Sequence, residues 1–359
     1  MNLIGRLRNR LTKRKRKKTQ RSIHDALDCA YRAATEHDIS ITERLIIFSD
    51  QHKGARDGAD DFQRCERAYN AALAYYNHLE YHLIELGDVE ELWENSFEEV
   101  AESYPQTLAL AARFHADGRY TRIWGNHDLA WSDEEFAQRM VPHGFPGMEP
   151  IEALRLVVHD GGQQMGELFL AHGHQGTASS DRHKKTSKFL VRYVWRALQR
   201  HLNRPWNTPS MDWALRGEHA HDLAEWASTR RRVLITGHTH LPVFFESAKV
   251  PAVTAEQVTA EQVTASVNPA DPERAEALRQ AWLEWAMAEV ERVRRQQPIP
   301  LHTPCYFNAG CCSFGDGDIT GLEISEGRIR LVRWPCVPDT DRVELQLMQL
   351  SDVFNLTQG

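Results

Sequence analysis

Polar side chains that could bind metal ions or transfer protons gather in five short clusters along the chain. Each cluster follows a run of apolar residues, and the five are Asp50-Gln51-His52, Gly87-Asp88, Gly125-Asn126-His127-Asp128, His172-Gly173-His174 and Gly237-His238-Thr239-His240. The binding sites of open α/β sheets form at the carboxyl ends of the strands. We therefore expect the five clusters to meet at one edge.

The residue types in these clusters predict a site for divalent metal ions. Asp, Asn and His supply oxygen and imidazole donors without any thiolate, a mixture that suits Mn, Fe or Zn. Seven candidate ligands exceed what one tetrahedral ion uses and suffice for two ions that share a carboxylate. Two ions about 3.5–4 Å apart clamp the attacking and leaving oxygens of a displacement at phosphorus. A hydroxide between them would be the nucleophile, because coordination lowers the pKa of water.

The immediate neighbours of these donors support the same interpretation. In four of the clusters a glycine adjoins a candidate ligand, where a tight turn and a close backbone approach are needed. In Asp50-x-His52 and His238-x-His240, alternate residues of an extended segment point the same way, so each pair can send two side chains to one site. A single such cluster is commonplace, but five in this order, each after a strand-like run, indicate a functional site.

Ten short runs, most of them apolar, have the length and the flanks of buried strands. They are Leu45–Phe48, Leu83–Leu86, Thr121–Trp124, Leu154–Val158, Leu168–Ala171, Val233–Thr236, Cys305–Ala309, Thr320–Ile324, Ile329–Trp334 and Arg342–Leu347. Helical stretches alternate with the earlier runs, beginning with a helix predicted around Ser22–Glu36. This alternation predicts an α/β architecture.

The composition is that of a globular protein with an uneven distribution of charge. The chain is 42% hydrophobic and 26% charged, which excludes collagen, coiled coils and extensive disorder. Residues 1–21, the basic arm, hold ten Lys or Arg and no acid, although the whole chain has a net charge of −7. Leu3, Ile4, Leu7 and Leu11 recur at helical spacing, so the arm could be an amphipathic anchor on an anionic membrane, a nucleic-acid-binding segment or a solubilising tail.

Two segments interrupt the alternation of strands and helices. The first, 181–228, has a helical apolar stripe bordered by basic residues, and it is either a cap over the substrate or an amphipathic helix packed on the sheet. The second, 250–299, joins a Val-Thr-Ala-Glu-Gln repeat to a charged helix, and we interpret it as a low-complexity insert. We expect the main domain to span 22–349, with 350–359 as a C-terminal tail.

The expected compartment is the cytoplasm, with a peripheral location at the inner membrane surface if the basic arm is an anchor. No apolar segment follows the arm, so it is not a secretory signal, and no apolar run has the length of a transmembrane helix. The six cysteines include no Cys-x-x-Cys pair and are expected to be free thiols.

The five clusters resemble the motifs of the calcineurin-like metallophosphoesterase superfamily: D-x-H, G-D, G-N-H-[DE], H and G-H-x-H. All five occur without substitution across residues 50–240. The resemblance implies a four-layer α/β/β/α sandwich of two mixed sheets with a dinuclear metal site. It also implies a hydrolase acting on phosphate esters or pyrophosphates, with Mn as the favoured metal.

The resemblance further implies a role for each residue. Asp50, His52 and His240 would bind the first metal, and Asn126, His172 and His238 the second, with Asp88 bridging both. His172 is preferred to His174 because the strand ends directly before it. His127 would stabilise the transferring phosphoryl group or protonate the leaving oxygen, and Asp128 would orient His127 through a hydrogen bond.

A narrower likeness concerns the residues after Asp88. The segment Gly87–Trp93 looks like the G-D-x-x-E-x-W block of the UDP-2,3-diacylglucosamine pyrophosphatase branch, although that branch has Arg in place of His127 and His-Gly-Asp in place of His172-Gly173-His174. Trp93 could line a pocket, and of Glu90, Glu91 and Glu94 we expect at least two on a solvated helix face. The substrate is expected to be a phosphodiester, pyrophosphate or phosphomonoester. The alternatives are a nucleotide-linked lipid precursor and a membrane-recruited scaffold without catalysis.

Overall fold

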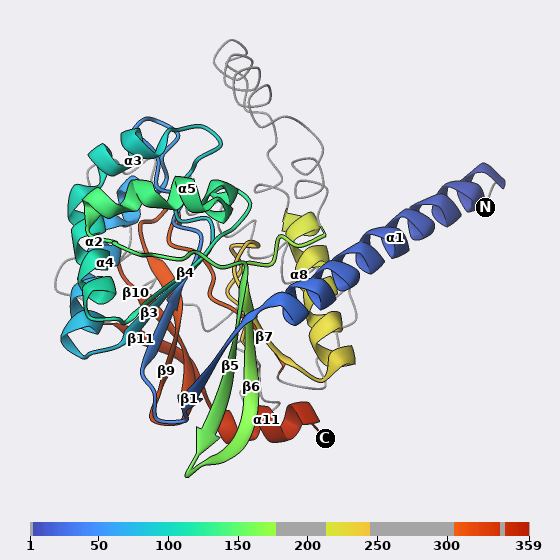
Figure 1. Ribbon diagram of the computed structural model, residues 1–359. Helices are drawn as coiled ribbons and strands as arrows, with labels where there is room; N and C mark the ends of the chain where they lie inside the picture. Colours follow the sequence, from blue (N-terminus) through green and yellow to red (C-terminus); the bar gives the residue numbers. More distant parts are fainter. Residues whose placement is uncertain (1–2, 177–212, 245–304, 338–341, 359) are drawn as a thin grey trace. The chain divides into compact units, whose positions relative to one another are not determined.

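A computed structural model of the chain describes residues 3–176, 213–244, 305–337 and 342–358 (Figure 1). The chain divides into two compact units, residues 1–244 with 303–359 and residues 245–302, and every described residue belongs to the first. The expected insert at 250–299, and the part of the 181–228 insert before residue 213, lie outside the described residues. None of the described helices is long and apolar enough to cross a membrane.

The described strands form a five-stranded sheet in the order β1-β5-β6-β7-β8 and a six-stranded sheet in the order β11-β10-β9-β2-β3-β4. Their bounds are β1 Thr35–Ser40, β2 Leu45–Phe48, β3 His82–Leu86, β4 Tyr120–Ile123, β5 Ala153–Asp160, β6 Gln163–Ala171, β7 Val233–Thr236, β8 Tyr306–Asn308, β9 Ile319–Ser325, β10 Arg328–Trp334 and β11 Val343–Gln349. The ten predicted runs coincide with β2 to β11. Strand β1 was not predicted, because it is a polar, mostly exposed edge strand that pairs with β5 alone.

Strand directions explain why the five clusters converge. Strands β2, β3 and β4 are parallel, and so are β6, β7 and β8. The carboxyl ends of β2, β3 and β4 therefore share one edge of the six-stranded sheet, and those of β6 and β7 share one edge of the five-stranded sheet. Each of these five ends leads into one of the polar clusters. The antiparallel pairs β2–β9, β9–β10 and β5–β6 make both sheets mixed.

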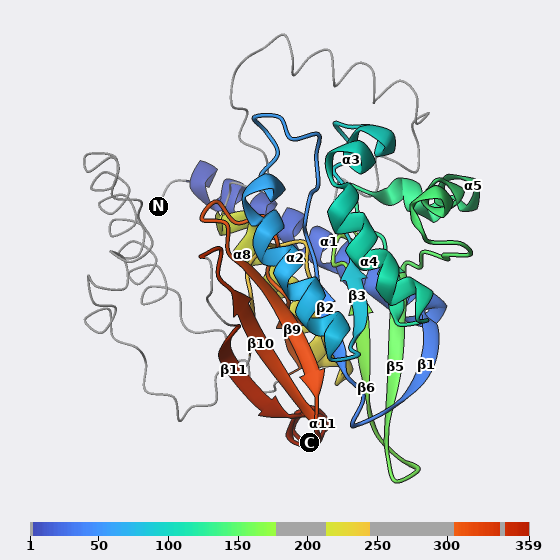
Figure 2. The ribbon, with the colours of Figure 1, turned by 90° about the vertical axis from the view of Figure 1, so that its left-hand side faces the viewer.

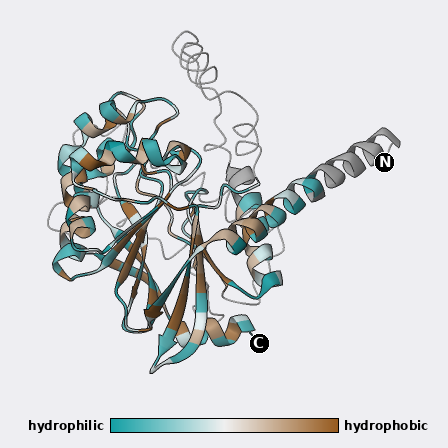
Figure 3. Cartoon of the chain, viewed as in Figure 1, coloured by the Kyte–Doolittle hydropathy of each residue, from teal (hydrophilic) through white to brown (hydrophobic). Residues whose placement is uncertain are grey.

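The two sheets pack face to face through one apolar core. Leu45 and Ile47 of β2 belong to the same buried cluster as Leu168 and Leu170 of β6. Because successive side chains of a strand point to opposite faces, the residues between them face outward. Figure 3 shows that the central strands of both sheets are predominantly hydrophobic, as expected for strands covered on both faces.

Helices cover the outer face of each sheet. On the six-stranded sheet, Ile46 and Phe48 pack with residues of α2 and α4. On the five-stranded sheet, Phe169 packs with Leu27 of α1 and Trp226 of α8. Figure 2 shows α2 and α4 in front of β2 and β3, with α1 on the far side. The expected α/β/β/α sandwich is therefore confirmed for the described part of the chain.

The helices begin and end where local sequence signals allow. They are α1 Leu3–Ala33, α2 Phe62–His78, α3 Phe97–Ser103, α4 Pro105–Ala116, α5 Glu134–Ala137, α8 Trp213–Arg230 and α11 Leu350–Gln358, with short 3-10 turns at Leu129–Ser132 and Gln138–His143. Helix α3 starts with a capping box, in which Ser96 and Glu99 satisfy each other's backbone N–H. Helix α1 runs without interruption through the basic arm and through most of the helix predicted after it.

The segment expected to be a C-terminal tail instead forms helix α11. Its Leu350, Val353 and Phe354 are buried in the core between the sheets, at the spacing that places them on one helix face. Gly166 of β6 makes room for this contact, since a Cβ atom there would lie 2.3 Å from the Phe354 ring. The last turns of the chain are thus part of the sandwich.

His82, the first residue of β3, predicts a pH dependence of stability. Its Nε2 lies 2.8 Å from the Thr121 hydroxyl, and burial, helped by His37 and Arg119, lowers its pKa from 6.5 to about 4. The unfolded chain therefore binds this proton more tightly, so stability falls as the pH drops from about 6.5 toward 4. His82→Gln should reduce that loss by an amount on the order of 2 kcal/mol in urea unfolding at pH 7 and pH 4.5. His78→Gln, at an exposed position, is the control and should leave the loss of stability between pH 7 and pH 4.5 unchanged. The same unchanged loss in His82→Gln would contradict the lowered pKa of His82.

Candidate metal centre

The turns that carry the candidate ligands have an uncommon backbone conformation. Five of these residues have positive φ angles: Asp50 at 56°, His52 at 49°, Asp88 at 53°, His238 at 64° and His240 at 57°. Few non-glycine residues adopt this left-handed region, and such strain collects at functional sites. The turns after β2, β3 and β7 therefore share a geometry that local propensity alone would not favour.

Two of the glycines in the clusters are required by close contact rather than by φ. A Cβ on Gly125 would lie 2.2 Å from Oδ1 of Asp88, and a Cβ on Gly237 would lie 1.8 Å from the Ser49 hydroxyl. These distances are too short for any side chain. The glycines thus let the loops after β4 and β7 approach the carboxylates that follow β3 and β2.

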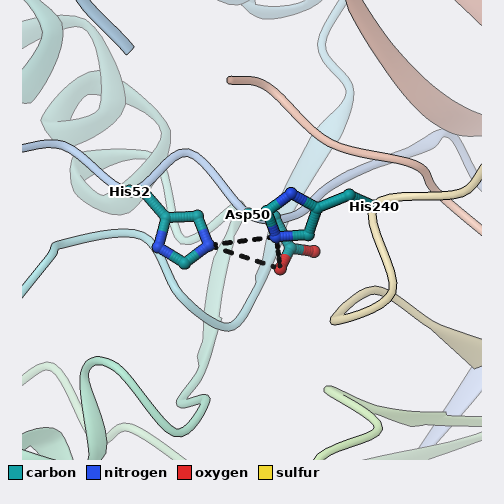
Figure 4. Close-up of side chains that lie close together, drawn as sticks. All are labelled: Asp50, His52 and His240. Carbon is teal, nitrogen blue, oxygen red and sulfur yellow. Dashed lines mark hydrogen bonds and ion pairs between the residues drawn. The ribbon is translucent and has the colours of Figure 1, made fainter. Parts of the chain in front are cut away.

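The first group of converging ligand atoms comes from Asp50, His52 and His240 (Figure 4). Nε2 of His240 lies 3.2 Å from Oδ1 of Asp50 and 3.2 Å from Nε2 of His52. Nε2 of His52 lies 3.7 Å from the same Asp50 oxygen. One donor atom of each residue thus faces the same small volume.

A second group comes from Asp88, His172 and His238. Nε2 of His172 lies 3.0 Å from Oδ2 of Asp88, while its Nδ1 donates a hydrogen bond to the Leu86 carbonyl at 2.9 Å. That bond fixes the tautomer and leaves the Nε2 lone pair for a ligand. Oδ2 of Asp88 also lies 3.8 Å from Nε2 of His52, so this carboxylate is within reach of both groups.

Two further histidines adjoin the second group. His174, the alternative to His172, belongs to none of the groups of converging ligand atoms among the described residues, and its ring centroid lies 6.5 Å from that of His238. His219 of α8, which the sequence did not single out, lies 5.3 Å from the His238 ring and donates to the Gly173 carbonyl at 2.7 Å. Helix α8 therefore supports the loop between His172 and His174.

The residues present fit a pair of divalent cations. Oδ1 of Asp50, Oδ1 of Asn126 and Nε2 of His172 are buried and have no hydrogen-bond partner among the described residues. Buried polar atoms without partners are costly, and these three are all atoms that could coordinate a metal. Asn126 precedes His127, whose backbone N–H donates to Oδ1 of Asp88 at 2.8 Å, so its turn lies directly against the shared carboxylate.

The charges of the site reinforce one another. Burial alone would raise the pKa of the Asp50 carboxyl, but His240 and His172 hold it far below its usual value. His172 and His127 act in the same way on the pKa of Asp88. Burial lowers the pKa of His172, but the nearby Asp88 and Asp50 carboxylates outweigh this effect and raise the pKa to about 9. Because a metal ligand must be deprotonated, protons and metal ions compete for this site.

The structure corrects the role expected for Asp128. Its carboxylate makes no hydrogen bond with His127 and instead accepts hydrogen bonds from the backbone N–H groups of Gly125 at 2.6 Å, Val89 at 2.9 Å and Asp88 at 3.3 Å. It also accepts one from Nη2 of Arg122 at 3.1 Å. The side chain is fully buried and satisfies donors of two turns at once, so it joins the loops after β3 and β4 rather than orienting a histidine.

Glu91 contacts His127 in place of Asp128. Nδ1 of His127 lies 2.6 Å from Oε2 of Glu91. Burial raises the pKa of Glu91, but the nearby His127 outweighs this effect and lowers the pKa to about 2. The expectation that at least two of Glu90, Glu91 and Glu94 lie on a solvated helix face is wrong. Glu90 is fully buried, and neither it nor Glu91 belongs to a helix.

A buried network of charges lies beneath the turns. Lys53 and Arg122 are both 1% exposed, and they pair with Glu85 and Glu90 behind Asp88. Arg122 lies 3.0 Å from Glu85 and also contacts Glu90 and Asp128. The sequence pattern does not reveal this network, because its members are spread over β3, β4 and two loops.

Asp128→Asn is expected to destabilise the fold. An amide in this position would turn an N–H toward backbone donors and remove a charged partner of Arg122, at a cost of about 2–4 kcal/mol. Urea unfolding of the metal-free protein measures the change. Asp117→Asn, which removes the exposed ion pair with Arg119, is the control and should cost less than about 1 kcal/mol. Equal stabilities for the two variants would contradict the role given to Asp128.

Comparisons with known proteins give slight similarities. No family model matches the chain, and no curated protein does. Vacuolar protein sorting 29 from Cryptosporidium parvum is 12% identical over 86% of this chain and 98% of its own, with a TM-score of 0.34. A dimetal phosphatase from Danio rerio is 9% identical over 85% of this chain and 99% of its own, with a TM-score of 0.36. A predicted phosphoesterase from Streptococcus pneumoniae is 11% identical over 84% and 98%, with a TM-score of 0.28.

The functional assignment depends on this chain's own residues. The two ligand groups come from the ends of four strands, β2, β3, β6 and β7, in two facing sheets, and Asp88 of the second group lies 3.8 Å from His52 of the first. The groups contain oxygen and imidazole donors alone, which suits divalent metal ions. The sandwich and the two ligand groups are consistent with the resemblance to calcineurin-like metallophosphoesterases that the five sequence motifs carry.

Proposed function

We propose that the chain is a dinuclear metal-dependent phosphoesterase that hydrolyses a phosphodiester, a pyrophosphate or a phosphomonoester. The observation that carries the proposal is the pair of ligand groups that meet at Asp88. Asp50, His52 and His240 would hold one ion with Asp88, and Asn126, His172 and His238 the other. When bound, two divalent ions activate water and neutralise the charge on a phosphoryl group in displacement.

The chain's own groups support the same reaction. His127 is partly exposed, with 24% of its side chain accessible, and its backbone N–H donates to the shared carboxylate of Asp88. From that position the ring could donate to a phosphoryl oxygen or protonate the leaving oxygen. The left-handed turns and the Asp128 hydrogen bonds hold the ligands in place before any ion binds, which limits reorganisation on binding.

Hydrolysis of bis-p-nitrophenyl phosphate tests this proposal. We expect turnover with added Mn²⁺ that is lost with a chelator and regained with fresh metal. Asp88→Ala should lower kcat by at least about 100-fold, because both ions lose a ligand. Glu98→Gln, which removes an exposed ion pair on α3, is the control. If the folded protein has no activity with Mn²⁺, Fe²⁺ or Zn²⁺, the proposal that the chain is an enzyme is contradicted, and a scaffold on this fold is favoured.

The same assay with other substrates addresses the substrate class. UDP-2,3-diacylglucosamine represents the nucleotide-linked lipid alternative that the Gly87–Trp93 segment suggests. Preference for this compound over simple diesters and monoesters would support that alternative. His127 stands where that branch has Arg, so we rank a different phosphodiester or pyrophosphate first.

We also propose that the basic arm contacts an anionic membrane surface. Helix α1 begins at Leu3, and its buried residues include Ile23, Leu27 and Ala30, which lie beyond the arm. The arm side chains that the structure describes are exposed at Arg16, Lys18, Thr19 and Arg21 and half-buried at Gln20. The ten cationic residues of 1–21 would each add about 1 kcal/mol near an anionic leaflet.

Vesicle flotation tests the role of the arm. The full chain should float with phosphatidylserine-containing vesicles at low salt and not with neutral vesicles, whereas a chain of residues 22–359 should float with neither. Far-UV circular dichroism checks that the shortened chain is folded. Equal flotation of both chains, or binding to DNA that anionic vesicles do not displace, would contradict membrane contact.

A further inference from the structure

The turn after β6 is held at the two peptide groups that flank its central glycine. Gly173 lies between His172 and His174 and has a φ angle of 105°, a conformation that favours glycine. Its backbone N–H donates to Oε1 of Gln175 at 3.0 Å, and its carbonyl accepts from Nε2 of His219 at 2.7 Å. Side chains therefore fix the peptide groups on both sides of Gly173, and one of these side chains comes from helix α8.

The imidazole of His219 also contacts the second ligand group directly. The rings of His219 and His238 meet edge to face, with centroids 5.3 Å apart and an angle of 78° between the planes. His172 and His238 are the two histidines of the second group. One contact of His219 thus acts on His172 through the Gly173 carbonyl, and the other reaches the His238 ring. Neither of these two contacts involves a residue of the first group.

Helix α8 is in turn fixed by helix α1. Trp226 of α8 is fully buried, and its indole N–H donates to Oδ1 of Asp28 in α1 at 2.9 Å. Arg230 of α8 pairs with the same carboxylate at 2.6 Å. Helix α1 also packs on the loop that follows the turn, since a Cβ on Gly176 would lie 2.5 Å from the Ser22 carbonyl oxygen. The turn after β6 is therefore supported by α1 as well as by α8.

We propose that His219 is a positioning residue for the second of the two metal ions, so that helix α8 of the 181–228 insert is a structural part of the metal centre. The inference deepens the proposed function and rests on it. A carbonyl only accepts hydrogen bonds, so Nε2 of His219 carries the hydrogen that holds the Gly173 carbonyl. Without that hydrogen bond the peptide group can rotate, and His172 loses the orientation that directs its Nε2 into the second group. The first ion does not depend on this hydrogen bond.

Metal binding tests the selectivity of this effect. Isothermal titration of the metal-free full chain with Zn²⁺ should give two binding events. His219→Phe keeps a ring beside His238 but removes the hydrogen bond, so it should weaken one event about 10- to 100-fold and leave the other within about 2-fold. His221→Phe, two residues along α8, is the matched control and should change neither event, because His221 pairs with Glu225 of the same helix. Equal weakening of both events, or no weakening, would overturn the proposal.

Histidine NMR identifies which ion is affected and needs no catalysis. In the metal-free chain with ¹⁵N-labelled histidine at pH 8, His219 should give the signals of the Nε2–H tautomer, and an Nδ1–H tautomer would overturn the proposal. On addition of Zn²⁺, the signals of His172 and His238 should shift together. In His219→Phe this shift should need at least about 10-fold more free Zn²⁺, whereas His52 and His240 should respond as in the unmodified chain. A loss confined to His52 and His240 would overturn the proposal.

Two more variants separate the hydrogen bond from a general loss of structure. His219→Gln keeps an N–H donor on this side chain and should recover at least about 5-fold of the Zn²⁺ affinity lost in His219→Phe. No recovery would contradict the role of the hydrogen bond. If His219→Phe does not fold, Gln175→Leu removes the acceptor of the Gly173 N–H and should give the same selective loss.

The outcomes also distinguish this inference from the proposed function. Selective weakening of the second ion in a chain without any phosphoesterase activity would support the His219 contact while contradicting the proposed function. An active enzyme in which His219→Phe weakens both ions equally would overturn the inference and leave the proposed function in place.

Discussion

Two buried carboxylates that face the same histidines are the constraint on which this structure depends. Asp50 and Asp88 are each at most 1% exposed, and both lie within 4.0 Å of Nε2 of His172. Like charges in a space without water repel each other strongly unless donors or cations surround them. The Ser49 hydroxyl and the backbone N–H groups of the facing loops donate to these carboxylates, and histidines provide the nearest positive charge. A pair of divalent ions would supply the remaining positive charge that these two carboxylates need.

The fold delivers these donors by bringing parallel strands to a common edge. Strands β2, β3 and β4 end side by side, and β6 and β7 end on the facing sheet, so loops far apart in sequence meet at the carboxylates. The apolar cores on both faces of each sheet hold this arrangement. Their burial offsets the strain of left-handed turns and the burial of charged groups.

Most of the strands and the convergence of the polar clusters were predictable from the sequence, and the reasons are physical. Strands buried on both faces are continuous apolar runs, and the candidate ligands follow them directly. Strand β1 and helix α11 were missed because the first is a polar edge strand and the second is a short segment whose buried residues pack into the core between the sheets. The roles of Asp128 and Glu91 depend on side-chain direction within a turn. Spacing along the chain does not encode that direction.

The left-handed ligand positions also constrain how this protein can change. Asparagine tolerates positive φ better than most residues, whereas β-branched residues do not. A change of Asp50 or Asp88 to Asn would therefore keep the turn and its neighbouring loops while removing the charge that attracts a metal. Substitutions at these two positions would therefore be limited first by the backbone conformation that the new residue must adopt, and only then by its effect on the charge of the site. A lineage of this chain could thus lose the negative charge of its candidate metal centre in one step and still retain a folded surface open to other uses.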